Sequence, residues 1–310
     1  MGFRQGCRHP GGHVARQTAP KNTGQGNTAP QDQEQRQMFE TARRTSTGSL
    51  LLSLLGVTYH ASVRKVRKTH GNALVAIGMS VFQSVLFLAA FYLIFTIMGA
   101  RTMAIRGDFM LYLLSGIFLY LVHIQALTSV MNSENSTSPM MQHAPMNTLV
   151  AILSSALSIL YVKTISILVI LFVLHTLFQP IEMDDWSGAM LMYLLAWGSG
   201  CAIGLILMAF KPWAPDVVSI IQLVYVRANM IASGKMFVAN TLPGFMLAMF
   251  DWNPLFHIID QTRGFVFVNY FPHYSNWQYP LYATFALIMI GMMGEFFTRK
   301  RASASWDARR

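Results

Sequence analysis

The chain has 310 residues, of which 53% are hydrophobic and only 12% are charged. Soluble domains carry roughly 25% charged residues, so this composition excludes an ordinary soluble domain and predicts an all-α, polytopic membrane protein. The formal net charge of +10 does not indicate nucleic-acid binding, because the basic residues flank the apolar region: 11 of the 23 Lys and Arg precede Gly71, and five lie from Arg299 onward. This distribution fits the positive-inside rule and predicts that both termini are cytoplasmic.

Three regions are expected along the chain. Residues 1–47 are rich in Gly, Gln, Asn, Thr and Pro and predict a disordered cytoplasmic tail. Met38 opens a different composition, so translation could begin at Met1 or at Met38. Residues 48–301 form the predicted transmembrane domain, and residues 302–310 a cytoplasmic C-terminal tail. No secretory signal peptide is visible before Met38, and the two cysteines, Cys7 and Cys201, predict no disulfide framework.

A surface helix is expected before the first span. Residues 48–61 are apolar but too few to cross a bilayer, and the basic run 64–68 follows at once. Such a stretch predicts an amphipathic helix that lies along the cytoplasmic membrane surface, where its basic residues meet anionic headgroups.

Six membrane spans are predicted, at residues 72–98, 109–131, within 145–178, 189–210, 217–238 and 279–297. The third region is too long for one simple span. It is interpreted as a cytoplasmic helix leading into a span, with Lys163 snorkelling at the inner boundary. The acidic loop that contains Glu182, Asp184 and Asp185 is expected outside.

A re-entrant helical hairpin is predicted over residues 242–271, before the last span. Pro243 and Gly244 break the preceding run, and Asn253 followed by Pro254 is a strong helix start. Neither apolar piece of this segment reaches the ~20 residues that a crossing requires. The segment therefore dips into the membrane and returns to the side from which it came.

Catalytic and metal-binding patterns are not found in the sequence. Gly234-Lys235 lacks the spacing of a phosphate-binding loop, the nine histidines are scattered, and Asp184-Asp185 is interpreted as part of a solvated loop. Asp260 is the one acidic candidate near a span, which disfavours an ion-coupled carrier. No catalytic residue, metal ligand or bound cofactor is therefore expected in this chain.

Several polar and aromatic residues could contact a substrate. Arg227 is either a pathway contact or a structural charge, and both interpretations stay open. Aromatic rings in the spans could stack on sugar rings, although such rings more often serve packing. The candidate path comprises Tyr92, Tyr120, Tyr225, Arg227, His257, Asp260 and Arg263.

The C-terminal half carries a series of motifs: Pro215-Asp216, Ser233-Gly234, Phe237, Leu242-Pro243, Asn253-Pro254-Leu255, His257 and Arg263-Gly264. With the basic surface helix, they resemble the permease subunits of type-2 ABC exporters, in particular the capsular polysaccharide, O-antigen and teichoic acid export family. By this resemblance, Ser233, Gly234, Pro243, Asn253 and Pro254 form a structural motif. The resemblance covers residues 48–301.

The resemblance implies a homodimer in a bacterial inner membrane, with a polysaccharide or lipid-linked glycan passing between the two halves. Separate ATPase subunits would bind ATP and Mg, and would dock against Arg64, Arg67, Pro139 and Pro145. Two alternatives stay open: a type-2 ABC permease for a drug or lipid, and a membrane-bound glycosyl- or acyltransferase. The enzyme would need a convergent acidic or histidine site, for which His257 and Asp260 are the candidates.

Overall fold

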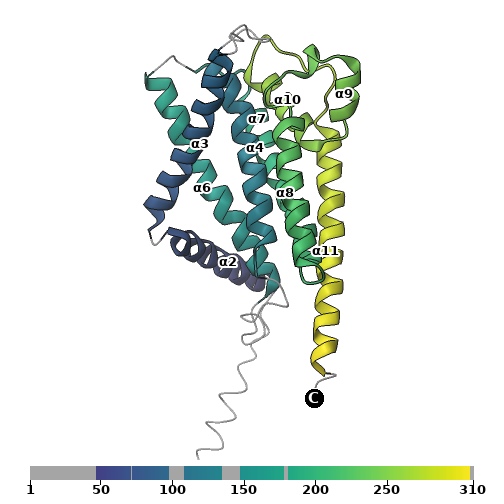
Figure 1. Cartoon of the computed structure of the whole chain (residues 1–310). Helices are drawn as coiled ribbons and strands as arrows, with labels where there is room; N and C mark the ends of the chain where they lie inside the picture. Colours follow the sequence, from purple (N-terminus) through teal and green to yellow (C-terminus); the bar gives the residue numbers. More distant parts are fainter. Residues whose placement is uncertain (1–46, 71, 98–107, 135–146, 178–180, 308–310) are drawn as a thin grey trace, which may run out of the picture. The chain divides into compact units, whose positions relative to one another are not determined.

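The computed structural model describes residues 47–310 except 71, 98–107, 135–146, 178–180 and 308–310. The predicted tail before Thr47 and the docking prolines Pro139 and Pro145 lie outside these residues. The chain divides into two compact units, 1–50 and 51–310, and everything below concerns the second. All regular structure in its described part is helical (Figure 1), which confirms the predicted fold class at this level.

By length and composition, five described helices could each cross a membrane. They are α3 (Ala73–Ile97), α4 (Phe109–Met131), α6 (Thr148–Leu177), α7 (Trp186–Phe210) and α11 (Gln278–Asp307). The predicted second span coincides with α4 residue for residue. The basic segment before α3 forms α2 (Thr47–His70). A multi-pass membrane architecture is thus supported by the apolar helices themselves.

Helix α4 is the centre of the bundle. In its most apolar stretch 83% of the residues are buried, whereas only 28% of the residues are buried in the corresponding stretches of α3 and α6. Small residues let α7 approach α4 closely: a Cβ on Gly200 would lie 2.3 Å from the His123 carbonyl oxygen, and one on Gly204 would lie 2.5 Å from that of Leu127. Close backbone contact through glycine is a common way for membrane helices to pack.

Helix α6 differs from its prediction. It is one continuous helix, and Lys163 in its middle is fully buried between helices instead of reaching the membrane surface. Its Nζ atom lies 3.4 Å from Ser84 Oγ and 5.9 Å from the centre of the Phe118 ring. The snorkelling prediction was wrong, because a neighbouring hydroxyl and an aromatic face receive this ammonium group within the bundle.

Helix α8 (Pro215–Ala232) is shorter than the predicted fifth span and is not among the five helices above. It ends because the chain turns at Gly234, whose φ of 74° suits glycine. A Cβ there would also lie 2.7 Å from Phe256 Cδ2. Figure 1 shows α8 running from the end of the bundle where α7 finishes to the opposite end, so a sixth crossing stays a prediction.

The predicted hairpin, residues 242–271, contains α9 (Gly244–Phe250) and α10 (Pro254–Val266), and a short 3₁₀ turn η1 (Ala239–Thr241) comes directly before it. Figure 1 shows α9 and α10 at the end of the bundle opposite the last turns of α11. Asn253 caps α10 by accepting a hydrogen bond from the Leu255 backbone N–H at 3.1 Å, with Pro254 in the first turn. This start is confirmed, while the depth of the hairpin in a membrane stays a prediction.

Candidate functional site

Helix α10 carries the densest group of buried polar side chains in the predicted substrate path. Arg263 is 1% exposed and holds the turn after α8. Its Nη1 donates to the carbonyl oxygens of Gly234 at 2.9 Å and Phe237 at 2.5 Å, and its Nη2 donates to that of Lys235 at 2.8 Å. The guanidinium lies 4.3 Å from the centre of the Tyr112 ring. These contacts join α10 to the turn and to α4.

Asp260 is bound by a different set of groups. Its Oδ1 accepts from the Tyr270 hydroxyl at 2.5 Å and from the Ala239 backbone N–H at 3.4 Å, while its Oδ2 accepts from the Ser275 hydroxyl at 2.7 Å. Burial, together with the negative charge of Asp260, raises the pKa of the Tyr270 phenol, so this hydroxyl stays protonated and keeps donating. Asp260 and Arg263 thus fix two different segments of the chain.

His257 joins α10 to the loops around it. Its Nδ1 accepts from the Asn276 backbone N–H at 3.2 Å, so Nε2 carries the proton. Nε2 donates to the Asp251 carbonyl oxygen at 2.7 Å and lies 3.2 Å from the Asp251 carboxylate. The ring is therefore held in one orientation, beside an opening at this end of the bundle.

That opening is a depression of about 600 Å³ lined by His257, Asp251, Asn276 and three aromatic residues, Trp252, Tyr274 and Tyr279. Trp252 and Tyr274 are 68% and 53% exposed. Aromatic faces beside amide, imidazole and carboxylate groups could bind a sugar, whose ring presents both C–H and hydroxyl groups. Of these residues only His257 was in the predicted path.

The other predicted path residues lie apart from this depression. The Tyr120 hydroxyl donates to the Val226 carbonyl oxygen at 3.1 Å, and the Tyr225 hydroxyl bonds His123 Nε2 at 2.9 Å. Tyr92 lines an apolar cavity of about 230 Å³ between α3, α4 and α6. Arg227 is exposed on α8. The seven residues therefore line no common cavity among those described.

Lys235 is a buried cation that sequence reasoning did not single out. It is fully buried, and its Nζ lies 3.7 Å from the centre of the Tyr120 ring and 4.9 Å from those of Phe87 and Phe91. Cation–π contact is worth about 2 kcal/mol or more when desolvated, which offsets part of the cost of burial. No local pattern could reveal it, because the three rings come from α3 and α4.

The predicted ATPase contacts are only partly described. Arg64 is exposed on α2, and Arg67 lies on the same helix, with its side chain outside the described part. Where α4 and α7 end, Lys211 Nζ donates to Asn132 Oδ1 at 2.7 Å. This hydrogen bond joins the turn after α7 to the end of α4. Within the described residues no group of three His, Cys, Asp or Glu could hold a metal ion.

The cap of α10 gives a first prediction. Besides capping, Asn253 donates through Nδ2 to Asn229 Oδ1 at 2.9 Å and to the Ala232 carbonyl oxygen at 3.1 Å. Asn253→Ala should cost about 2–4 kcal/mol, through the lost cap and the buried acceptors left unpaired. Thermal unfolding of the purified protein measures this. The matched control is Asn240→Ala, at an exposed asparagine bonded to the Phe271 carbonyl, and equal losses in both variants would contradict the prediction.

Comparison of the chain with protein-family models and with curated proteins finds no match. The functional conclusion below therefore rests on the residues and their arrangement.

Proposed function

We propose that this chain is the permease subunit of an ATP-driven exporter that moves a polysaccharide or a lipid-linked glycan out of the cell. It would act as a homodimer in a bacterial inner membrane, with both termini in the cytoplasm and six crossings, α8 included. Separate ATPase subunits would bind ATP and Mg and dock near α2.

The observation that carries this proposal is the contrast between the two ends of the bundle. One end holds the basic helix α2 and the C-terminal end of α11 (Figure 1), where Arg299, Lys300 and Arg301 lie. The other end holds α9 and α10 with the aromatic depression. A basic end suits the cytoplasmic membrane surface and a docking ATPase, while the aromatic and polar depression suits a sugar chain leaving on the far side.

In this proposal the hairpin acts as a fixed rim. Arg263, Asp260 and His257 use their polar atoms to hold the turn after α8 and the loop before α11. The rim would keep Trp252 and Tyr274 in place as stacking surfaces. A hydrophilic chain could then leave the membrane along polar groups instead of lipid.

The proposal is tested by disrupting the gene in its host and measuring surface and intracellular glycan. We expect the surface glycan to disappear and the intracellular pool to grow. The full chain should restore export, a chain lacking residues 1–37 should also restore it, and one lacking residues 48–68 should not, because the second deletion removes most of α2.

Other outcomes would favour the alternatives. Loss of the glycan from both pools would indicate a glycosyl- or acyltransferase. Unchanged glycan with altered drug resistance or lipid composition would indicate a permease for those substrates. Equal rescue by the two deletions would contradict a docking role for α2.

A further inference from the structure

Another cavity lies at the opposite end of the bundle from the aromatic depression, where α2 meets α3, α4 and α6. It measures about 480 Å³, within the roughly 300–1,000 Å³ typical of small-molecule sites. Its polar lining consists of Lys65, Ser80, Gln83, Gln125, Ser129 and Ser158. Among the described residues that line it, Lys65 carries a formal charge and none is acidic.

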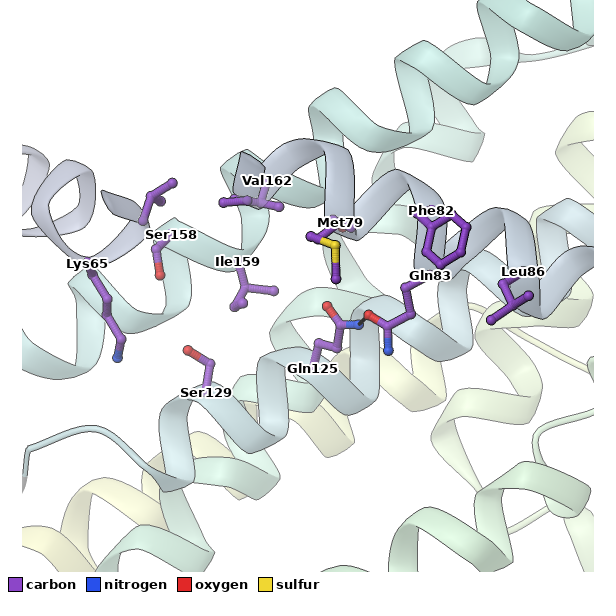
Figure 2. A pocket seen from close by; sticks show the side chains of 13 residues that line it. Lys65, Met79, Phe82, Gln83, Leu86, Gln125, Ser129, Ser158, Ile159 and Val162 are labelled. Atoms are coloured by element: carbon purple, nitrogen blue, oxygen red, sulfur yellow. Dashed lines mark hydrogen bonds between the residues drawn. The ribbon is translucent and has the colours of Figure 1, made fainter. Parts of the chain in front are cut away.

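The ammonium group of Lys65 and the apolar side chains of Phe82 and Leu86 lie at opposite ends of this cavity, with Ile159 and Val162 also near the Lys65 end and Gln83 beside Leu86 (Figure 2). Figure 2 shows Lys65, Ser129 and Ser158 around one end, and Phe82 and Leu86 at the other. Lys65 Nζ donates to Ser155 Oγ, which places the ammonium beside α6. A ligand with a compact anionic head and an apolar tail would match this arrangement of charge and apolar surface.

Ser80 gives an independent indication that a ligand belongs here. It is 8% exposed, and its Oγ is buried with no hydrogen-bond partner within the described chain. A buried hydroxyl without a partner costs free energy, and it lines this cavity. A bound phosphate oxygen would satisfy it.

Further donors lie in the middle of the cavity. Gln125 Nε2 donates to Gln83 Oε1 at 3.0 Å (Figure 2), a bond that uses one N–H of Gln125 and the amide oxygen of Gln83 but neither N–H of Gln83. The hydroxyls of Ser129 and Ser158 both donate to the Ser155 carbonyl oxygen, at 3.1 and 2.9 Å. Hydroxyl hydrogens rotate, so both groups could donate to a phosphate instead.

We propose that this cavity binds the phosphate headgroup of an anionic membrane lipid, with the upper part of one acyl chain lying against Phe82 and Leu86. The headgroup belongs to the leaflet on whose surface α2 lies. The bound lipid fills the space between α2 and the bundle and holds the surface helix against α3, α4 and α6. This inference needs no particular transported substrate and is independent of the function proposed above.

The test compares lipid retention by the purified full-length chain, measured by native mass spectrometry in detergent. The probes are dioleoylphosphatidylglycerol, dioleoylphosphatidylcholine and inorganic phosphate. We expect the phosphatidylglycerol to be retained, and Lys65→Gln to reduce its retention about fivefold or more, since a charge-assisted hydrogen bond is about twice as strong as a neutral one. The matched control Arg64→Gln removes the same charge from the same helix, at a residue outside the cavity lining, and should retain the lipid as the wild type does.

A second variant, Ser80→Ala, is needed because Lys65→Gln could reduce lipid retention simply by weakening the packing of α2 against the bundle. It removes a hydroxyl that makes no hydrogen bond within the described chain, so the variant should fold as the wild type and lose about two- to fivefold in lipid retention. Equal retention of the two lipids, or unchanged retention of phosphatidylglycerol in both cavity variants, would overturn the proposal. Retention of inorganic phosphate equal to that of phosphatidylglycerol would also overturn the lipid assignment. That result would indicate a site for free phosphate.

Discussion

Replacing Arg263 with alanine should remove most of the protein from the membrane. The substitution leaves the carbonyl oxygens of Lys235 and Phe237 without their side-chain donor, while the Gly234 carbonyl keeps only the Phe237 backbone N–H, at 3.4 Å. Each of the two lost donors costs about 1–3 kcal/mol, so the total of roughly 2–6 kcal/mol is a large share of the stability of a typical protein, about 5–15 kcal/mol. The turn after α8 would separate from α10.

The measurement is the abundance of tagged protein in isolated membranes, followed by thermal unfolding of whatever is purified. Arg227→Ala is the matched control, because it removes an arginine that is exposed on α8. Arg263→Lys should rescue little, since one ammonium cannot reproduce the fork of the guanidinium. An Arg263→Ala variant that is stable and fails only in export would contradict this structural role. It would support the sequence prediction that Arg263 contacts the substrate.

Gly200→Ala is expected to have the second large effect. The added methyl group would lie 2.3 Å from the His123 carbonyl oxygen, so α4 and α7 would have to separate. Overpacking of this kind typically costs about 1–3 kcal/mol, and more where the obstructing atom is backbone. Strain there would also disturb His123, whose Nδ1 lies 2.9 Å from Ser199 Oγ and 3.2 Å from the Ala196 carbonyl oxygen on α7.

Gly198→Ala provides a control two residues away on the same helix. The new methyl group would lie 3.8 Å from a Thr284 methyl, an ordinary contact, so the alanine should be neutral or slightly stabilising through its better helix propensity. Thermal unfolding of the two variants in the same detergent gives the comparison. Equal behaviour would mean that α4 and α7 are not in backbone contact at Gly200.

The features that the sequence predicted well are local ones. The apolar run of α4 has clear ends, and the Asn-Pro pair marks the start of α10 by itself. Lys163 was misplaced because its surroundings come from α3 and α4, which no local pattern shows. The end of α8 was missed because Gly234 was interpreted as part of a span, whereas the turn depends on Phe256 and Arg263, more than 20 residues further on.

The candidate site was predicted in part for the same reason. His257, Asp260 and Arg263 were predicted as residues of the substrate path, and in the structure each forms hydrogen bonds with other parts of the chain. Their partners are the loops before and after α10, so the sequence could not distinguish groups that face a substrate from groups that fix the hairpin. Trp252 and Tyr274 belong to loops, where hydrophobic periodicity carries no information about a shared opening.

The glycine contacts of α4 and α7 have a mechanical consequence. Gly200 and Gly204 bring these two helices into backbone contact, and a Cβ on Gly291 would lie 2.9 Å from Leu205, so α11 is also closely packed against α7. Tightly packed interfaces resist sliding, while cavities leave room for it. The cavities of about 480 and 230 Å³ both lie along α3 and α6. In any working cycle, α4, α7 and α11 should therefore move together as one rigid body. Relative motion should occur mainly where α3 and α6 contact these three helices.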